Sequence, residues 1–400
     1  MNENNNLQIF SKNENTKIIN IIDIDKYKEF EENKLLNYAI EKLPSNYNFE
    51  IYKSLYKIKE ISKNLKENRK PLISLQFPDG LMIFSEIISD ILSQFGNCET
   101  IIIGDITYGA CCITDIDCKI LKSDLLIHYA HSCLIPMDFV EVNILYVFVE
   151  IKIDVDFLVK TIEVNFPKEL NTFFYIASSI QFNSSLFILK KKLIEKGYLN
   201  SNINIPQIKP RSMGEIIGCT SPKLKKTNNS IVLFICDGRF HMESLMIQNP
   251  SFTFYQYNPF LKKLTTEEYD INLMKKIRLN QIKKFKESKL IGIIQGTLGK
   301  QGEPKILKRL NKLLKEKKIK FINIMMNEIT EEKINKFPQC DCFIQNACPR
   351  LSIDWSDQFS KPMLNPYEAF VAFEENVFSE GYEMSNYSFE TGQWGHFYNK

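Results

Sequence analysis

Three cysteines, Cys111, Cys219 and Cys348, are the residues of this chain best suited to carry chemistry. They lie far apart in the sequence, yet each sits among small or turn-forming residues: YGAC at 108–111, GCT at 218–220 and ACPR at 347–350. The intervals between them are each about the length of one small α/β unit. Three soft thiolates that converged from successive units would suit an iron–sulfur cluster with one iron left open to a substrate.

The other cysteines are weaker candidates, with one real rival. We expect Cys112 to point away from Cys111, and Cys236 to be a core residue of an apolar strand. Cys133, in HSC at 131–133, follows the third predicted strand of its unit, as Cys348 does, so the residues alone leave the choice between Cys111 and Cys133 open. A single cysteine is more often a small buried hydrophobe than a ligand. No C-x-x-C pair is present, which argues against a zinc ribbon or a thioredoxin-like site.

The bulk composition is that of an ordinary globular protein. The 400 residues are 44% hydrophobic and 25% charged, and the net charge of +3 is too small to favour nucleic acid or an anionic membrane as a partner. Ten cysteines are too sparse for a disulfide scaffold. The first residues are polar, without the apolar segment of a secretory signal, and no apolar run is long enough to span a membrane. We therefore expect a reducing, cytoplasmic setting.

Alternating strand and helix patterns position the cysteines. Buried strands at 72–77, 100–104 and 125–129 are separated by helical spacing, which predicts a parallel sheet, and the same rhythm returns twice. We predict an α/β fold of three similar units. The predicted division is an N-terminal extension at 1–68, disordered in its first 15 residues and then helical, α/β units at 69–142 with Cys111, 143–228 with Cys219 and 229–375 with Cys348, and a polar tail at 376–400.

Four further groups could line a site. His128 and His131 frame the end of a predicted strand, and His241 follows the turn DGR at 237–239. The glycine-rich loop at 295–302, which begins with Gln295, suggests contact with an anion or a small ligand at a helix N-terminus, although it is not a P-loop. Arg350 could hold a carboxylate, or could form a structural salt bridge with Asp354 or Asp357.

Six segments together resemble one family. They are QFPDGL at 76–81, GDITYGACC at 104–112, HYAHSC at 128–133, GCT at 218–220, DGRFH at 237–241 and ACPRLSIDW at 347–355. In this order they resemble the diphthamide-biosynthesis enzyme that makes 3-amino-3-carboxypropyl-histidine, and in particular its eukaryotic first subunit, over about residues 70–373. The residues outside this range match poorly.

The resemblance implies a fold and a chemistry. It implies three α/β domains in a pseudo-threefold arrangement around a [4Fe–4S] cluster held by Cys111, Cys219 and Cys348, with Cys133 at a position that the family does not use. S-adenosylmethionine would be the co-substrate, and its 3-amino-3-carboxypropyl group would pass as a radical to C2 of a histidine of elongation factor 2. The resemblance leaves the catalytic residues unknown; His131, His241, Gln295 and Arg350 are candidates for contacts with the substrates.

The resemblance also implies partners. They are a related second subunit, a small metal-binding electron donor, and elongation factor 2 as the protein substrate. Two alternatives stay open: a subunit that only scaffolds the same complex, and a quinolinate-synthase-like iron–sulfur enzyme that acts on a small molecule. The complete set of three cysteines favours the catalytic role over the scaffold.

Overall fold

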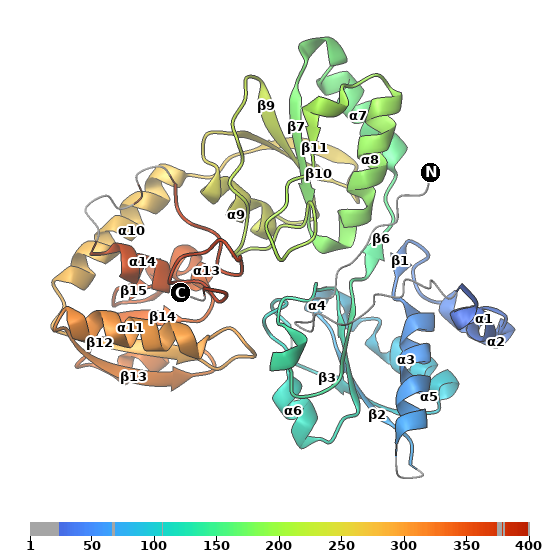
Figure 1. The fold of residues 1–400 in the computed structure, drawn as a ribbon, viewed down its shortest axis with the longest axis horizontal. Helices are drawn as coiled ribbons and strands as arrows, with labels where there is room; N and C mark the ends of the chain where they lie inside the picture. Colours follow the sequence, from blue (N-terminus) through green and yellow to red (C-terminus); the bar gives the residue numbers. More distant parts are fainter. Residues whose placement is uncertain (1–23, 66–68, 106, 374–377, 379–380, 399–400) are drawn as a thin grey trace, which may run out of the picture.

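The protein consists of three α/β units, each built on its own sheet (Figure 1). The computed structural model describes residues 24–65, 69–105, 107–373, 378 and 381–398. When the first four strands of each unit are numbered along the chain, all three sheets have the order 2-1-3-4, and these strands are parallel. The predicted fold class and internal repeat are therefore confirmed. None of the helices in the described part of the chain is both long and apolar enough to cross a membrane.

The first unit carries Cys111 and is drawn in blue and teal in Figure 1. Its strands are β2 (Leu72–Gln76), β3 (Glu99–Ile103), β4 (Leu125–Tyr129) and β5 (Ile144–Val147), and its helices are α4 (Asp79–Met82), α5 (Ser85–Gly96), α6 (Asp115–Ile120) and the 3₁₀ turn η2 (Met137–Phe139). The residues between β3 and α6 form the Cys111 loop, which leaves the sheet at the carboxyl end of β3.

The predicted helical lead-in belongs to this first unit. It forms η1 (Ile24–Tyr27), α1 (Lys28–Glu31), α2 (Lys34–Ile40) and α3 (Ile51–Asn64), and α3 packs on α5. Ile51, Leu55 and Ile58 of α3 are buried at helical spacing against the sheet. The short strand β1 (Tyr47–Asn48) pairs antiparallel with β6 (Glu150–Ile151) and so ties the lead-in to the chain between the first two units. The first 15 residues, predicted to be disordered, lie outside the described residues.

The second unit is a five-stranded sheet. Its strands are β7 (Phe173–Ser178), β8 (Ile203–Asn204), β9 (Ser230–Ile235), β10 (Thr253–Asn258) and β11 (Lys263–Glu267), of which only β11 is antiparallel to its neighbour. Its helices are α7 (Val155–Asn165), α8 (Asn183–Glu195) and α9 (Phe240–Gln248), with the 3₁₀ turns η3 (Lys168–Leu170), η4 (Ile180–Phe182) and η5 (Asn200–Asn202). The long connection from β8 to β9 contains Cys219.

The third unit repeats the first. Its strands are β12 (Leu290–Gly296), β13 (Lys320–Met326), β14 (Cys342–Asn346) and β15 (Met363–Leu364), and its helices are α10 (Ile271–Lys286), α11 (Pro304–Glu316), α12 (Glu331–Asn335), α13 (Pro349–Asp354), α14 (Pro366–Val371) and the 3₁₀ turn η6 (Ser356–Gln358). Helix α11 begins with a proline after the Glu303 cap and buries Ile306, Leu310 and Leu314 at every fourth position. Cys348 lies directly before α13.

Strand pairing corrects the predicted division of the chain. Strand β5, assigned by sequence to the second unit, pairs with β4 of the first. Strand β9, assigned to the third unit, pairs with β7 in the second sheet. The boundaries at 142/143 and 228/229 were wrong because the sheet that a strand joins depends on a long-range partner, which local periodicity does not reveal.

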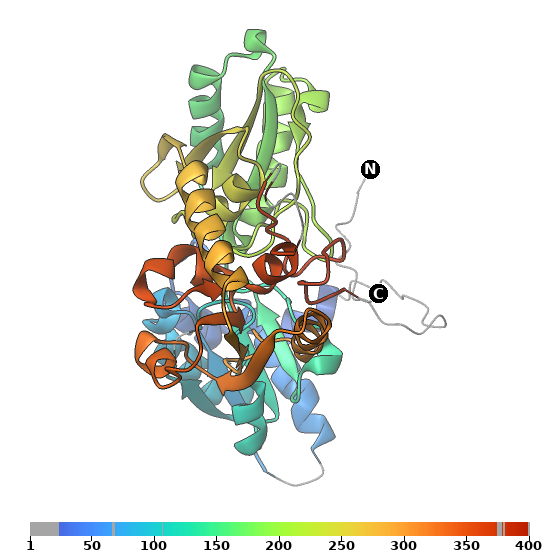
Figure 2. The same cartoon turned by 90° about the vertical axis from the view of Figure 1, so that its left-hand side faces the viewer.

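The C-terminal segment is also not the polar tail that we predicted. Its described part, 381–398, drawn in dark red, runs between the second and third units (Figures 1 and 2). Tyr382, Met384 and Tyr387 are buried in it. The described part of this segment therefore packs within the assembly of units.

Arg278 of α10 and Glu368 of α14 form a fully buried ion pair in the third unit. Arg278 Nε lies 2.6 Å from Glu368 Oε1, and the same guanidinium donates to the carbonyl oxygens of Ser352 and Met363. Both side chains are 0% exposed, so each charge is stabilised in the protein interior only by its partner and by hydrogen bonds.

We predict that Arg278→Ala lowers the free energy of unfolding by about 3–5 kcal/mol, because it leaves the Glu368 carboxylate buried without a counter-charge. Denaturant unfolding followed by circular dichroism measures this change. Lys312→Ala is the control: Lys312 pairs with Glu316 on the surface, and its loss should cost at most about 1 kcal/mol. Equal effects of the two substitutions would contradict the prediction.

Candidate functional site

The three candidate cysteines lie on loops at unit boundaries. Cys111 follows β3 in a turn closed by the Cys112 amide, which donates to the Gly109 carbonyl. Cys219 lies in a tight turn between Ile217 and Thr220. Gly218 has no alternative there, since a Cβ would come within 2.0 Å of the Phe240 ring.

The structure brings these three thiols into one electrostatic environment. The pKa of Cys111 is held well above its ordinary value by its hydrogen bond with Cys112, by burial, and by the nearby Cys348 and Cys219. Burial and Cys348 raise the pKa of Cys219 to about 12. Burial also raises the pKa of Cys348. Grouped thiols oppose one another's ionisation, so a thiolate set here requires a cation among them.

The donor set fits an iron–sulfur cluster better than a single ion. Among the described residues no group of three His, Cys, Asp or Glu side chains is arranged to hold one metal ion. In a cluster each cysteine binds a different iron, so its sulfurs stand farther apart than around one ion. Cys111, Cys219 and Cys348 are partly exposed thiols from three units, so they can offer three soft ligands to such a cluster.

We expected Cys112 to point away from Cys111, but in the structure the two thiols lie side by side. The two Sγ atoms lie 3.9 Å apart, and Gln301 Nε2 lies 3.3 Å from Cys112 Sγ. The hydrogen bond with Cys111 lowers the pKa of Cys112 to about 7. Neighbouring side chains point to opposite sides in a strand, but these two cysteines lie in a turn.

Cys133, the rival candidate, lies in a different environment. It is exposed, and its Sγ lies 3.6 Å from the Ile135 carbonyl oxygen. Burial raises the pKa of its thiol, and Arg211 opposes that shift. Arg211 also donates to the Cys133 carbonyl and to Ser132, and so fixes this loop against the second unit.

The glycine-rich loop holds the Cys111 loop. The Lys300 amide donates to the Cys111 carbonyl at 2.7 Å, and the Lys300 ammonium lies 2.9 Å from the buried carboxylate of Asp115. Gly299 adopts φ +54°, and a Cβ there would lie 2.6 Å from the Cys111 oxygen. In the structure this loop contacts protein backbone where we predicted a small ligand. Gln295 is likewise engaged, because its oxygen accepts from Asn346.

Three histidines line the region between the first two units. His128 Nδ1 lies 2.8 Å from the oxygen of Gln76, whose amide donates to the Cys112 carbonyl. The ring centroids of His128 and His131 are 5.1 Å apart. Burial and the neighbouring His241 lower the pKa of His131 to about 4, and burial and Arg350 do the same for His241. His131 Nδ1 has no hydrogen-bond partner among the described residues.

A cavity of about 310 Å³ opens beside His241. It lies at the carboxyl ends of β2, β7 and β9, where open α/β sheets bind ligands. Its lining includes Pro78, Ala130, Gln181, Asp237 and His241.

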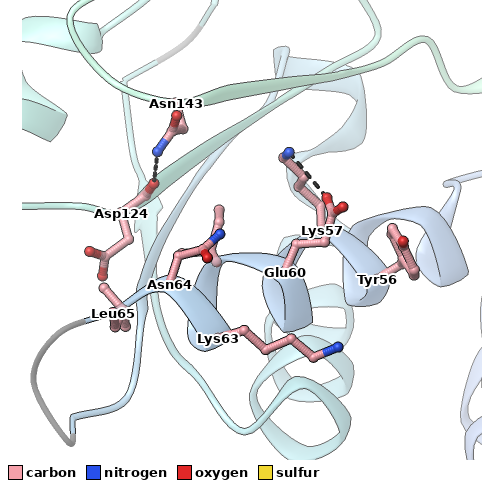
Figure 3. A pocket seen from close by; sticks show the side chains of 9 residues that line it. Tyr56, Lys57, Glu60, Lys63, Asn64, Leu65, Asp124 and Asn143 are labelled. Atoms are coloured by element: carbon pink, nitrogen blue, oxygen red, sulfur yellow. Dashed lines mark hydrogen bonds and ion pairs between the residues drawn. The ribbon is translucent and has the colours of Figure 1, made fainter.

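A second, larger hollow lies at the amino ends of the strands of the first sheet, opposite to the end where such sheets bind ligands. Figure 3 shows it beside the C-terminal half of α3, with a volume of about 560 Å³. Its wall includes the Lys57–Glu60 ion pair and the hydrogen bond from Asn143 to the Asp124 carbonyl. Asp124 and Asn143 precede β4 and β5, so this hollow is at the amino ends of the strands, away from the cysteine loops.

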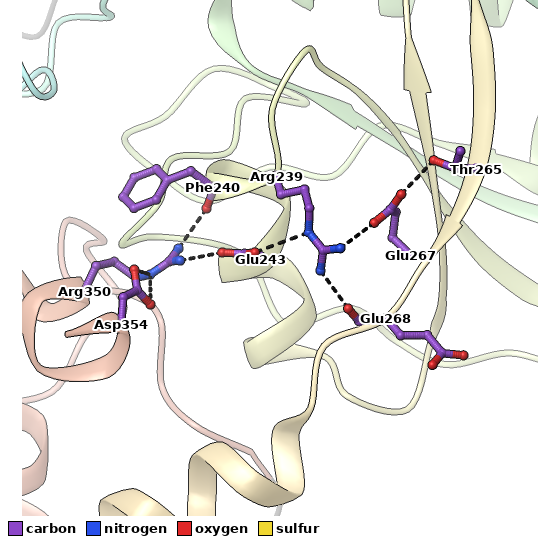
Figure 4. Close-up of polar contacts among 8 residues, drawn as sticks. All are labelled: Arg239, Phe240, Glu243, Thr265, Glu267, Glu268, Arg350 and Asp354. Atoms are coloured by element: carbon purple, nitrogen blue, oxygen red, sulfur yellow. Dashed lines mark hydrogen bonds and ion pairs between the residues drawn. The ribbon is translucent and has the colours of Figure 1, made fainter. Parts of the chain in front are cut away.

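Arg350 joins the second and third units (Figure 4). Its Nε donates to Asp354 at 2.9 Å, one terminal nitrogen lies 2.6 Å from Glu243, and the other donates to the Phe240 carbonyl. The side chain is only 3% exposed. Of the two predicted roles, the structure has the salt bridge with Asp354, and the guanidinium has no free edge for a substrate carboxylate.

Sequence reasoning missed Tyr387. It is 2% exposed and packs in the same apolar cluster as Cys111 and Cys219. Its pKa is held well above the ordinary value, first by burial and then by the nearby Cys111, Cys219 and Cys348. Only the lone aromatic residues of the C-terminal segment could have hinted at this position.

Comparison with known proteins identifies the class. The sequence profile of the diphthamide synthesis protein family matches residues 77–383, which is most of the chain. The chain therefore belongs to that family, as the sequence motifs had indicated.

Curated relatives and solved structures agree with this assignment. "2-(3-amino-3-carboxypropyl)histidine synthase subunit 1" of Dictyostelium discoideum is 46% identical over 373 residues, 92% of this chain and 76% of that protein. The protein of the same name from Saccharomyces cerevisiae is 45% identical over 88% of this chain and 81% of its own length. Dph2 from Pyrococcus horikoshii, solved with a 4Fe-4S cluster, has a TM-score of 0.65 and 26% identity over 83% of this chain and 93% of that one.

We predict that Arg350→Ala lowers the free energy of unfolding by about 3 kcal/mol, since it leaves Glu243 and Asp354 without their buried partner. Arg239→Ala is the matched control: Arg239 also contacts Glu243 but is 45% exposed, so its loss should cost at most about 1 kcal/mol. Thermal and denaturant unfolding measure both. Unchanged stability together with weaker S-adenosylmethionine binding would instead assign Arg350 to the ligand.

The buried histidines predict a dependence of stability on pH. Between pH 6.5 and about 4 the unfolded chain binds protons that folded His131 and His241 do not, so stability falls as the pH is lowered through this window. Each such histidine contributes a slope of up to about 1.4 kcal/mol per pH unit. Carboxylates act in the same direction, so the test compares unfolding of the native chain and His241→Gln from pH 7.5 to 5. The variant should show the shallower slope; identical slopes would contradict the assignment.

Proposed function

We propose that this chain is the cluster-bearing subunit of a 2-(3-amino-3-carboxypropyl)histidine synthase. It transfers the 3-amino-3-carboxypropyl group of S-adenosylmethionine to C2 of a histidine of elongation factor 2, the first step of diphthamide biosynthesis. The observation that carries the proposal is the meeting of Cys111, Cys219 and Cys348 from three units. The names of the relatives and the cluster in the Pyrococcus horikoshii protein support it.

Cys111, Cys219 and Cys348 would hold the cluster, and the fourth iron would have no protein ligand. When bound, a reduced cluster supplies the electron that cleaves the sulfur–Cγ bond of S-adenosylmethionine and releases a 3-amino-3-carboxypropyl radical. The chain itself provides the geometry: the Lys300 amide holds the Cys111 loop, and Arg350 ties the Cys348 helix to the Cys219 turn through the Gly218 carbonyl.

The cavity of about 310 Å³ is where we place S-adenosylmethionine. Its volume lies in the range of small-ligand pockets, and it contains an acidic residue, Asp237, after a strand, as ribose-binding sites do. His241 is neutral near pH 7, so it can accept a hydrogen bond there but adds no positive charge. His131 is neutral as well but does not line the cavity. Gln295 and Arg350 are less suited to substrate contacts because their polar atoms bind protein groups.

Partners follow from the same assignment. The relatives are named as first subunits, which implies a further subunit in the complex. We propose that this is a related second subunit, and that a small metal-binding protein delivers the electron. The two alternatives, a scaffold subunit and a small-molecule dehydratase, explain less: a scaffold needs no convergent thiols, and the matching relatives carry the histidine synthase name.

The test is anaerobic reconstitution of the chain, with and without its second subunit, using iron and sulfide. We predict the visible absorption of an iron–sulfur cluster and a four-iron electron paramagnetic resonance signal after dithionite. Alanine at Cys111, Cys219 or Cys348 should abolish the signal, and should also abolish transfer of label from carboxyl-labelled S-adenosylmethionine to elongation factor 2. Cys133→Ala is the control and should retain both.

Three results would contradict the proposal or part of it. If the native chain stays colourless even with its second subunit, it holds no iron–sulfur cluster. If the signal is lost with Cys133→Ala and kept with Cys111→Ala, then Cys133 and not Cys111 is the ligand. A cluster that forms without labelling elongation factor 2 would favour the small-molecule enzyme.

A further inference from the structure

The C-terminal segment joins the Cys219 turn by backbone pairing. We call residues 382–398 the strap. The Asn386 amide donates to the Cys219 carbonyl at 3.0 Å, and the Tyr387 amide donates to the Thr220 hydroxyl at 2.8 Å. The Ser221 amide donates to the Met384 carbonyl at 2.6 Å. The residues on both sides of the Cys219 turn therefore depend on the strap for their hydrogen bonds.

The far end of the strap is fixed to the third unit. His396 Nε2 donates to the carbonyl of Gln301, in the loop that also holds Cys111, at 3.0 Å. Arg309 of α11 donates to the carbonyls of Gly395 and Tyr398, and Trp394 packs edge-on against Tyr367. One segment thus joins the Cys219 turn to the loop that holds Cys111.

Tyr387 lies at the centre of this connection. Its ring stacks on His396 with centroids 4.0 Å apart and an angle of 27° between the planes. Both side chains are at least nine-tenths buried, and Tyr387 packs with Cys111 and Cys219. The ring pair therefore forms an apolar wall next to the thiols.

The strap leaves almost no space beside Cys219. The cavity lined by Cys219, Pro349, Asn386 and Trp394 measures about 10 Å³, which is at the lower limit for one water molecule. The cavity beside His241, by contrast, measures about 310 Å³. The strap side of the cysteine site is therefore closed, whereas the side of the second unit that carries His241 has open space.

We propose that Tyr387 and His396 are positioning residues that close the cysteine site against solvent on the strap side. Tyr387 and His396 lie beyond residues 77–383, the segment that matches the family profile. This inference rests on the proposed function only in taking the three cysteines as cluster ligands. The closure itself is a property of the chain without the cluster.

The experiment measures thiol reactivity in the full-length, cluster-free chain. N-ethylmaleimide is added under anaerobic, reducing-agent-free conditions, and alkylation at each cysteine is followed by peptide mass spectrometry. Exposed Cys133 gives the reference rate, and buried Cys236 and Cys342 report on folding. We expect Tyr387→Ala to speed alkylation of Cys111, Cys219 and Cys348 by about tenfold or more relative to Cys133, as local opening becomes easier.

Two further variants make the comparison specific. His396→Ala should also raise the rates, by removing the stacking partner and the bond to Gln301. Tyr387→Phe keeps the ring and should leave the rates within about twofold of the native chain, because shielding depends on the ring. Phe389→Ala is the matched control: it removes a ring from the same segment, but Phe389 is 53% exposed, so the rates should not change.

A second measurement separates this inference from the proposed function. In reconstituted chains, loss of the visible cluster absorption to a chelator should be about tenfold faster for Tyr387→Ala than for Phe389→Ala. If no cluster forms but the thiol rates rise as described, the proposed function fails and the closure stands. If Cys111, Cys219 and Cys348 react at native rates in Tyr387→Ala and His396→Ala, the closure is wrong. If Cys236 and Cys342 also react in Tyr387→Ala and His396→Ala, these variants have lost their fold, and Tyr387→Leu is tested in their place. Native alkylation rates of Cys111, Cys219 and Cys348 in Tyr387→Leu would then overturn the inference.

Discussion

The structure depends on one constraint: three thiols from separate sheets must meet, although grouped thiols raise one another's pKa. No unit can satisfy this alone, because each contributes one cysteine on a loop outside its own core. The geometry of the site is therefore the geometry of the interfaces between units. The similar 2-1-3-4 sheets supply rigid supports, and the loops that follow their strands carry the three cysteines.

The interfaces are fixed by polar contacts that are mostly buried. Arg350 joins the Cys348 helix to Glu243 of the second unit, and Lys300 joins the glycine-rich loop to Asp115 of the first. Buried ion pairs add modestly to stability but are costly to break, so they favour one arrangement of the units over others. The strap adds backbone pairing between the second and third units. The result is a site whose walls come from every unit.

The strands and the three candidate cysteines could be picked out from the sequence because both leave local signals: runs of apolar residues and short motifs. It failed where long-range contacts decide. Strand β8 has two residues and β5 joins an earlier sheet, so unit boundaries could not be placed by periodicity. The glycine-rich loop was assigned to a ligand, and the structure shows it against the Cys111 backbone. Tyr387 was missed because nothing in a polar C-terminal segment marks which aromatic ring is buried.

The repeat of the units is not a repeat of their cysteines. Cys111 and Cys219 both follow the second strand of their units, but Cys348 follows the third, which is the position of Cys133 in the first unit. If the units descend from one ancestor by duplication, copying alone could not have produced the present trio. At least one thiol had to be gained or lost afterwards, while the sheets kept their order. The positions of the cysteines can thus change while the order of the strands is kept, and Cys133 occupies in the first unit the position that Cys348 occupies in the third.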